Sequence, residues 1–294
     1  MAYTVAIIAP GEMGSAVAAR LTERGVRVTT SLAGRSAAST ARAERARMVP
    51  IGDDTALVGE ADFILSILPP GDAVALAQRL RPAIAGSPRK PIYVDCNAVS
   101  PDTARVIGDV LAGTGCRYVD GGIVGPPPQS NPSATHIYVS GEAANEVARL
   151  NDFGLYFRPL EAPIGAASAM KMSYGGITKG FTAIAVAMTI GASRAGCAEA
   201  LHAELAESQP QLLAWLTRQV PRMYPKAYRW VAEMQEIGHF LGEGSPAGDM
   251  FDAVARLYED IAADAREPDE ANGPIAPLAR FYETTSEPQA RKRA

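Results

Sequence analysis

The chain has 294 residues, of which 47% are hydrophobic and 20% are charged, so it can bury a sizeable core and wholesale disorder is excluded. Its 28 Lys and Arg residues against 32 Asp and Glu residues give a formal net charge of −4, which argues against nucleic acid or an anionic membrane as the main partner. The three cysteines, Cys96, Cys116 and Cys197, do not have metal-site spacing. We therefore expect a reduced, cytoplasmic protein without a signal peptide or a metal centre.

The first half of the chain alternates short β-branched runs with helical patterns. The predicted strands are Thr4–Ala9, Arg27–Ser31, Phe63–Leu68, Pro91–Asn97, Arg117–Ile123 and His136–Ser140. The predicted helices between them are Met13–Arg24, Ala37–Arg47, Asp72–Ile84 and a helix that starts at Ser100-Pro101 and runs to Ala112. This alternation predicts an α/β domain over residues 1–162, with a Rossmann-type, doubly wound and mostly parallel sheet.

The second half, residues 163–294, is rich in Ala, Leu, Met and Glu, and predicts an all-α C-terminal domain. Its predicted helices are Gly165–Arg194, Leu201–Leu216, Tyr228–Leu241 and Phe251–Arg266. The most apolar window, Gly180 to Ala192, is about thirteen residues long, too short to span a bilayer, and predicts a buried core helix. Because the helix that contains it has more apolar surface than a small domain covers, we expect a homodimer packed through the helical domain.

A glycine-containing turn follows the first predicted strand and precedes the first predicted helix. Such a turn brings the backbone close to a pyrophosphate, and the helix N-terminus supplies free N–H groups. The alternative is a tight structural turn. Ala9 stands where the pattern has its first glycine, and we expect any small side chain to suffice there. The residues predicted to bind a dinucleotide in this turn are Ala9, Gly11, Glu12, Met13 and Gly14.

The end of the second predicted strand distinguishes the two nicotinamide cofactors. An NAD enzyme places an acid there to bind the ribose 2′-hydroxyl, yet no Asp or Glu occurs between Val26 and Ala43. Arg35 and Ser36 follow the strand instead, and a guanidinium can bind a 2′-phosphate. The alternative for Arg35 is a solvated loop residue. The sequence therefore favours NADP(H) over NAD(H).

Other strand ends are expected to lie beside the nucleotide, because ligands of such sheets bind beyond the carboxyl ends of the strands. Asn97 follows a strand and offers a donor and an acceptor to the cofactor and the substrate, although a purely structural turn residue is the alternative. The remaining residues predicted to contact the cofactor are Leu68, Pro69, Pro70 and Val74.

These motifs, in this order, resemble those of the β-hydroxyacid dehydrogenases, which share their fold with 6-phosphogluconate dehydrogenase and the imine reductases. The segments that carry the resemblance are APGEMGS at 9–15, GRS at 34–36, DCNAVSP at 95–101, DGGIVG at 120–125 and GAASAMKMSYG at 165–175. They span about 175 residues, and the helical half resembles the short, divergent C-terminal domain of one branch of this superfamily.

The resemblance implies that Lys171 is the catalytic residue, with Gly122, Ile123, Val124 and Tyr174 around the substrate. A lysine buried on an apolar helix near a cationic nicotinamide has a lowered pKa, so it can exchange a proton with an alcohol or a carbonyl. The alternative is a surface lysine near a helix start.

Lys179, eight residues further along, is expected to be structural or to face a phosphate. Val124 replaces a family serine, and Tyr174 with Gly175 replaces an asparagine pair, which predicts a less polar substrate pocket.

The leading hypothesis is an NADP-dependent oxidoreductase that interconverts a small-molecule, hydroxyacid-like alcohol and a carbonyl by hydride transfer, with Lys171 as general acid and base. An imine reductase is the first alternative, and relatives with that activity usually carry Asp or Tyr at the lysine position. A non-catalytic NADP-binding protein is the second alternative.

Overall fold

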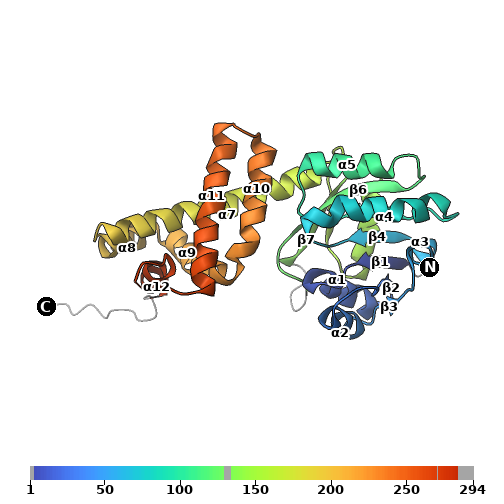
Figure 1. The fold of residues 1–294 in the computed structure, drawn as a ribbon, viewed down its shortest axis with the longest axis horizontal. Helices are drawn as coiled ribbons and strands as arrows, with labels where there is room; N and C mark the ends of the chain where they lie inside the picture. Colours follow the sequence, from blue (N-terminus) through green and yellow to red (C-terminus); the bar gives the residue numbers. More distant parts are fainter. Residues whose placement is uncertain (1–2, 129–133, 270, 284–294) are drawn as a thin grey trace. The chain divides into compact units, whose positions relative to one another are not determined.

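The structure is a computed structural model that describes residues 3–128, 134–269 and 271–283 (Figure 1). Internal packing divides the chain into two units, Met1–Met172 and Ser173–Ala294. The division falls inside one long helix, α7 (Ala166–Arg194), ten residues beyond the boundary predicted from composition.

The first unit contains a sheet of eight strands within the described residues, in the order β3-β2-β1-β4-β5-β6-β7-β8. The strands are β1 (Thr4–Ile8), β2 (Arg27–Thr30), β3 (Val49–Pro50), β4 (Phe63–Ser66), β5 (Ile92–Asp95), β6 (Arg117–Val124), β7 (His136–Ser140) and β8 (Phe157–Pro159). Neighbouring strands are parallel except β6 and β7, which are antiparallel. The predicted Rossmann-type, mostly parallel sheet is confirmed, whereas β3 and β8, of two and three residues, are too short to leave a recognisable pattern.

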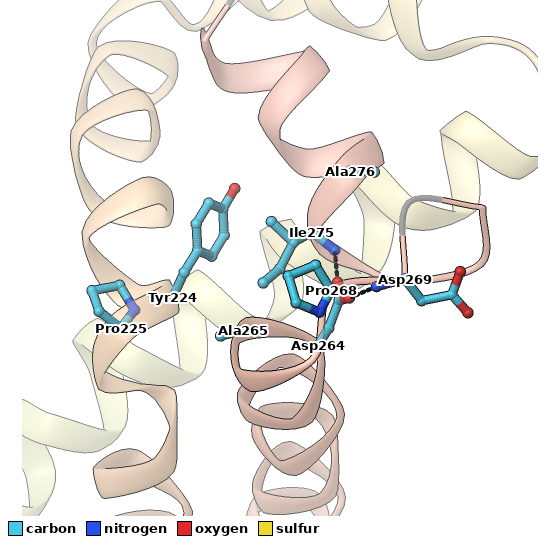
Figure 2. Close-up of a pocket in the computed structure, with 8 residues that line it drawn as sticks. All are labelled: Tyr224, Pro225, Asp264, Ala265, Pro268, Asp269, Ile275 and Ala276. Carbon is cyan, nitrogen blue, oxygen red and sulfur yellow. Dashed lines mark hydrogen bonds between the residues drawn. The ribbon is translucent and has the colours of Figure 1, made fainter.

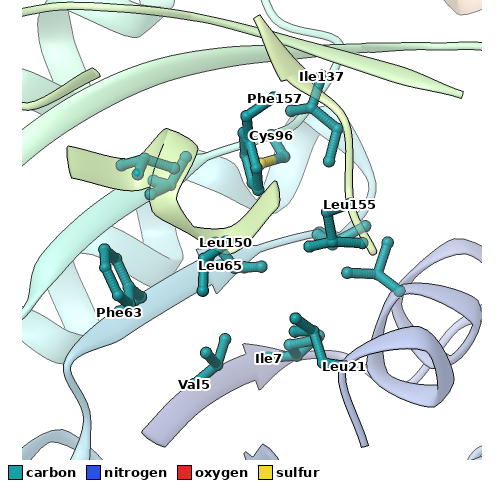
Figure 3. Packing of buried hydrophobic residues seen from close by; sticks show 14 of the residues in the cluster. Val5, Ile7, Leu21, Phe63, Leu65, Cys96, Ile137, Leu150, Leu155 and Phe157 are labelled. Carbon is teal, nitrogen blue, oxygen red and sulfur yellow. The ribbon is translucent and has the colours of Figure 1, made fainter. Parts of the chain in front are cut away.

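Alternating side chains of β1 build a core on each face of this sheet. Val5 and Ile7 belong to one core, and Ala6 and Ile8 belong to the other, because successive strand residues point to opposite faces. The first core is closed by residues of α1 (Glu12–Glu23), α2 (Ala37–Arg45), α6 (Ala144–Val147) and the 3-10 helix η3 (Ala148–Phe153). Figure 3 shows Leu21 of α1 and Leu150 of η3 beside the strand residues of this core. The second core is closed by residues of α3 (Asp54–Glu60), α4 (Ala73–Gly86) and α5 (Pro101–Leu111).

The strand order reverses at β1, which lies between β2 and β4. The chain leaves β1 toward β2 and β3 on one side and returns through β4 to β5 and β6 on the other. In open α/β sheets such a reversal separates the loops that follow the two central strands and leaves a crevice between them. Here those loops are the turn after β1 and the segment after β4 that leads through the 3-10 helix η1 (Pro70–Asp72) into α4.

The second unit contains helices and connecting loops, and no strand, within the described residues. After α7 it contains α8 (Ala198–Ser208), α9 (Pro210–Met223), the 3-10 helix η4 (Tyr224–Lys226), α10 (Ala227–Leu241), α11 (Pro246–Arg266) and α12 (Ile275–Glu283). The predicted single helix over Leu201–Leu216 is wrong, because Gln209 leaves the helical conformation with φ −136° and Pro210 starts a new helix. The helix α12 has no counterpart among the predicted elements.

Glycines of α7 allow close packing against α11. A Cβ at Gly176 would lie 3.3 Å from the Phe251 ring, and one at Gly180 would lie 3.2 Å from it. Gly176 and Gly180 are therefore sites of close approach, as expected, whereas a Cβ at Gly191 would meet nothing within 4 Å. Lys179 lies between them and forms an ion pair with Glu233 of α10, and its ammonium lies 5.2 Å from the centre of the Trp230 ring, so its expected structural role holds.

The whole of α7, unlike its apolar window alone, is long enough to be compared with a membrane-spanning helix. The predicted apolar window is short, but the whole helix has 29 residues, and in the described part of the chain it is the one helix that is long and apolar enough to cross a bilayer by length and composition alone. Within its most apolar stretch 39% of the residues are buried, and core helices of other proteins pass the same test.

The start of α12 is fixed by a buried carboxylate at the end of α11. Asp264 accepts hydrogen bonds from the backbone N–H of Asp269 and of Ile275, each at 2.8 Å (Figure 2). Gly273 passes so close that an added Cβ would lie 2.3 Å from the same carboxylate. These contacts lie beside a cavity of about 420 Å³ whose lining also includes Tyr224 and Pro268.

Replacing Asp264 by Ala should lower the free energy of unfolding by about 1–2 kcal/mol, because two partly buried N–H groups lose their acceptor. Chemical denaturation measures the change. Asp260→Ala, an exposed carboxylate on the same helix, is the control and should change stability by less than about 0.5 kcal/mol. Equal losses in both variants would show that the carboxylate does not fix α12.

Candidate active site

The turn after β1 has the conformation of a phosphate-binding turn. Ala9 adopts φ +69°, and its carbonyl accepts the N–H of Gly11 at 2.8 Å. A Cβ at Gly14 would lie 2.5 Å from the Ala9 carbonyl oxygen, so only glycine allows α1 to start this close to the turn. The expectation that Ala9 needs only a small side chain is incomplete, since the position also requires a left-handed backbone that costs a non-glycine residue about 1–2 kcal/mol.

This turn leaves room and donors for a diphosphate. Gly11 is the N-cap of α1 and makes no side-chain cap, and a Cβ built on it would meet nothing within 4 Å. The first N–H groups of an α-helix have no partner within the helix and carry the positive end of its dipole. The residues present therefore fit the pyrophosphate of a dinucleotide, with Glu12, Met13 and Gly14 in the first turn of the helix.

The segment after β2 forms a short turn that exposes Arg35. The Arg35 N–H binds the Leu32 carbonyl at 3.1 Å, and Gly34 takes φ +69° within that turn. Ser36 caps α2 by accepting the N–H of Ser39. The guanidinium of Arg35 is exposed beside the N-terminus of α2, and its contact with a 2′-phosphate stays a prediction.

Arg42, which the sequence patterns did not single out, connects α2 to the glycine-containing turn. Its Nε donates to the Pro10 carbonyl at 2.9 Å, and its Nη2 donates to the Ser39 hydroxyl at 3.1 Å. The signal in the sequence that could have indicated this contact is a second arginine seven residues after Arg35, within the predicted helix. This contact fixes the turn that follows β1 relative to the start of α2.

Asn97 is buried, with 3% of its surface exposed, and its amide is fully engaged. Its oxygen accepts the Leu68 N–H at 2.7 Å, and its nitrogen donates to Ser66 at 2.8 Å and to Asp95. The side chain therefore holds the loop that contains Leu68, Pro69 and Pro70 at the end of β4. Its direct contacts with cofactor or substrate stay predictions, as do those of Val74, which packs at the edge of the second core.

Two buried carboxylates lie on neighbouring strands, Asp95 at the end of β5 and Asp120 in the middle of β6. Asp95 and Asp120 are register partners, and both are fully buried. Burial raises the pKa of Asp95 to about 7, and repulsion from Asp120 adds to the increase, whereas hydrogen bonds from Ser66 and Asn97 oppose it.

Asp120 caps the N-terminus of α7. One of its oxygens accepts the N–H groups of Gly165 and Ser168 and the Ser140 hydroxyl, each at 3.0 Å, and the other accepts the Ser168 hydroxyl at 2.6 Å. The Ser140 hydroxyl accepts the N–H of Ala167 at 3.1 Å. Asp120 belongs to one of the motifs in the sequence, but the motif predicts no role for it. The roles of Ser140 and Ser168 were not predicted either, because the cap joins segments that are distant in the chain.

The cap places Lys171 directly against β6. A Cβ built on Gly122 would lie 2.8 Å from the Lys171 Cβ and 2.9 Å from the Ala167 carbonyl oxygen, so a glycine is required where α7 crosses the strand. Burial lowers the pKa of the Lys171 ammonium, and no hydrogen bond or ion pair holds that ammonium among the described residues. Lys171 therefore lies beside Gly122 of β6 with a lowered pKa, and its catalytic role stays a prediction.

The other predicted substrate residues fall into two groups. Ile123 is buried in the first core, and Val124 is half-buried at the end of β6, opposite His136 of β7. Tyr174 belongs to the second unit and has 48% of its surface exposed. Their contacts with a substrate remain predictions.

Residues 4–152 match the model of the family described as the NAD binding domain of 6-phosphogluconate dehydrogenase. Residues 192–261 match the model of a domain of unknown function, DUF1932. The chain belongs to the 6-phosphogluconate dehydrogenase NAD-binding family. It is thereby a member of the β-hydroxyacid dehydrogenase-like superfamily, and the resemblance noted in the sequence is confirmed.

Similar proteins match the chain along nearly its whole length. An uncharacterized 28.5 kDa protein of Methanothermus fervidus is 26% identical over 258 residues, which cover 87% of this chain and 98% of that protein. The solved structure of MTH1747, a conserved protein of unknown function described as similar to 3-hydroxyacid dehydrogenases, is 28% identical, with a TM-score of 0.73 and coverage of 90% and 98%.

Two enzymes share the fold at lower identity. The 3-hydroxyisobutyrate dehydrogenase of Mycobacterium tuberculosis is 17% identical, with a TM-score of 0.66 and coverage of 95% and 99%. A reductive aminase of Aspergillus terreus is 19% identical, with a TM-score of 0.55 and coverage of 96% and 100%. The fold of this family member is therefore that of NAD(P)-binding dehydrogenases and of imine-reducing enzymes.

Ala9→Gly should raise the free energy of unfolding of this family member by about 0.5–1 kcal/mol. Glycine removes the left-handed strain of about 1–2 kcal/mol at φ +69°, and the greater freedom of the unfolded chain offsets part of that gain. Urea denaturation of the variant measures the difference. The matched control is Ala33→Gly, at an exposed alanine without a positive φ, which should lower stability. If Ala9→Gly is destabilising as well, the turn does not hold the strained conformation.

Proposed function

We propose that this protein is an NADP(H)-dependent oxidoreductase that interconverts an alcohol and a carbonyl, with Lys171 as general acid and base. The observation that carries the proposal is the position of Lys171: a half-buried lysine, free of carboxylate partners among the described residues, against Gly122 of β6 in a dinucleotide-binding unit. The family and the hydroxyacid dehydrogenases that share its fold support a reaction of this class.

Lys171 supplies the proton chemistry. When bound, the nicotinamide accepts a hydride from the carbinol carbon or returns one to the carbonyl carbon. In oxidation, neutral Nζ of Lys171 accepts the hydroxyl proton as the C–O bond becomes a carbonyl. In reduction, the ammonium returns that proton to the carbonyl oxygen. Desolvation favours the neutral amine, so both forms are accessible closer to neutral pH than for an exposed lysine.

The other predicted site residues of the first unit hold the cofactor. Gly11 and the first turn of α1 bind the pyrophosphate, while Arg35 and Ser36 bind the 2′-phosphate of NADP(H). Asn97 positions the loop after β4 through the Leu68 N–H. The substrate is a small molecule less polar than a hydroxy-carboxylate, because Val124 and Tyr174 replace polar family residues.

The cytoplasm is the compartment we assign to this reaction. All three cysteines are free, and Cys96 lies inside the first core, where burial raises the pKa of its thiol. Free thiols suit a reducing compartment.

Lys171→Ala should leave the NADPH dissociation constant within about twofold and lower kcat by about 100-fold or more, because proton transfer loses its donor and acceptor. The measurement is turnover of NADPH or NADP+ with a panel of aldehydes, ketones, alcohols and imines. Lys226→Ala, an exposed lysine of the second unit, is the control and should retain full activity.

The pH profile tests the same residue. Oxidation requires neutral Lys171, so kcat for oxidation should rise as the pH increases through the lysine pKa. Reduction requires the ammonium, so kcat for reduction should fall over the same pH range. That pKa should lie below the ordinary value of about 10.4. Unchanged activity and an unchanged profile in Lys171→Ala would exclude this mechanism, whereas tight NADPH binding without turnover of any substrate would indicate a non-catalytic NADP-binding protein.

Arg35→Ala should raise the dissociation constant of NADPH by at least about tenfold and that of NADH by less than about twofold. The reason is that a charge-assisted hydrogen bond to the 2′-phosphate contributes about 1.5–3 kcal/mol. Fluorescence titration gives both dissociation constants. Arg45→Ala, an exposed arginine at the other end of α2, should change neither. Equal weakening of both cofactors would place the 2′-phosphate elsewhere.

A further inference from the structure

Arg42 of α2 connects the two segments of the first unit that are predicted to bind the phosphates of the cofactor. Its Nε donates to the Pro10 carbonyl oxygen, in the turn after β1, at 2.9 Å. Its Nη2 donates to the Ser39 hydroxyl, in the first turn of α2, at 3.1 Å. Since Pro10 and Arg42 lie 32 residues apart in the chain, one side chain joins segments that are distant in sequence. We call these two contacts the Arg42 link.

One end of the Arg42 link lies in the turn that is predicted to bind the pyrophosphate. Pro10 is buried between Ala9, at φ +69°, and Gly11, the N-cap of α1. Among the described residues the hydrogen-bond donor to the Pro10 carbonyl is Arg42. A residue with a strained φ keeps that conformation only where the surrounding contacts hold it. The guanidinium is therefore one of the contacts that fix the backbone from which α1 starts.

The other end of the Arg42 link reaches the predicted 2′-phosphate site. The Ser39 hydroxyl accepts from Arg42 and also from the Ser36 hydroxyl, which lies 3.2 Å away. Ser36 in turn accepts the backbone N–H of Ser39 as the N-cap of α2, directly after Arg35. Two hydrogen bonds therefore connect the guanidinium of Arg42 to a hydroxyl that is predicted to contact the 2′-phosphate.

The Arg42 link requires a guanidinium. Its Nε–H and Nη2–H donors belong to one rigid planar group, so they can bind two acceptors at fixed positions at the same time. A lysine ammonium is instead a single point at the end of a flexible chain. Arg42→Lys would therefore keep the positive charge of α2 and lose the simultaneous contact with both segments.

The two nicotinamide cofactors differ at one end of the Arg42 link. Both carry the pyrophosphate, whereas NADP(H) has the additional 2′-phosphate. NADP(H) would therefore bind at both ends, beside Pro10 and beside Ser36, and NAD(H) would bind beside Pro10 only. A link that already holds two binding segments at one separation lowers the ordering cost of a ligand that contacts both of them. The link therefore favours the cofactor that carries the extra phosphate.

We propose that Arg42 is a positioning residue that couples the 2′-phosphate site to the pyrophosphate turn and thereby increases the preference for NADP(H) over NAD(H). This inference rests on the proposed use of NADP(H), and it assigns part of that preference to a residue that acts through Pro10 and Ser39. If Arg42 only stabilised the packing of α2 against the turn, its loss would weaken both cofactors alike.

The test measures the dissociation constants of NADPH, NADH and adenosine 2′-monophosphate by titration calorimetry of the full chain. Arg42→Lys should raise the constant for NADPH at least about tenfold and that for NADH by less than about threefold. The constant for adenosine 2′-monophosphate should stay within about twofold, because this ligand does not reach the pyrophosphate turn. In an Arg35→Ala background, Arg42→Lys should change the constant for NADPH by less than about threefold, since residues of one network have non-additive effects.

Arg45→Lys, at an exposed arginine in the last turn of α2, is the matched control and should leave all three constants within about twofold. Circular dichroism shows that the variants are folded. Equal weakening of NADPH and NADH by Arg42→Lys, or additive effects in the double variant, would overturn the coupling. Weaker binding of adenosine 2′-monophosphate would overturn it in favour of a direct contact between Arg42 and the 2′-phosphate. A wild type that binds NADPH no more tightly than NADH would overturn the proposed use of NADP(H) itself.

Discussion

The carboxylate of Asp120 is the contact on which the candidate site depends. It is fully buried and accepts two N–H groups and two hydroxyl groups from β7 and the start of α7. Hydrogen bonds to a charged acceptor contribute about 1.5–3 kcal/mol each, and a helix N-terminus adds favourable electrostatics. The backbone thus compensates a charge that would otherwise be costly to bury, and in doing so it positions the first turn of α7 over Gly122.

The neighbouring carboxylate has a different environment and a different effect. Asp95 lies next to Asp120 in the sheet, yet among the described residues its hydrogen bonds come from Ser66 and Asn97 and not from a helix N-terminus. Burial and the neighbouring carboxylate raise its pKa to about 7. The Asn97 amide nitrogen donates to Asp95, and its oxygen accepts the N–H of Leu68, just after β4. One acid therefore orders the helix that carries Lys171, and the other orders the loop at the crevice.

Local patterns were sufficient to predict what depends on consecutive residues. The central strands, the turn at Gly11 and Gly14, the Ser100-Pro101 helix start and the position of Lys171 on a helix all follow from periodicity, capping chemistry or the motif resemblance. The break at Pro210 carried a local signal, the proline itself, that the periodicity of the surrounding residues outweighed.

What could not be predicted depends on contacts between distant segments. The bond from Arg42 to the Pro10 carbonyl spans 32 residues, and the bond from Ser168 to Asp120 spans 48. The positive φ of Ala9 is likewise visible only in the folded turn, because the sequence pattern alone suggests that any small residue is adequate there.

The continuity of α7 has a consequence for recombinant design. The packing boundary between the units lies at Met172 and Ser173, but the helix crosses it without interruption. A fragment that stops at residue 172 would keep seven residues of the helix, fewer than the length at which isolated helical turns persist in water. Chimeras between relatives are better joined ahead of the cap, near Gly165, so that the whole helix comes from one parent.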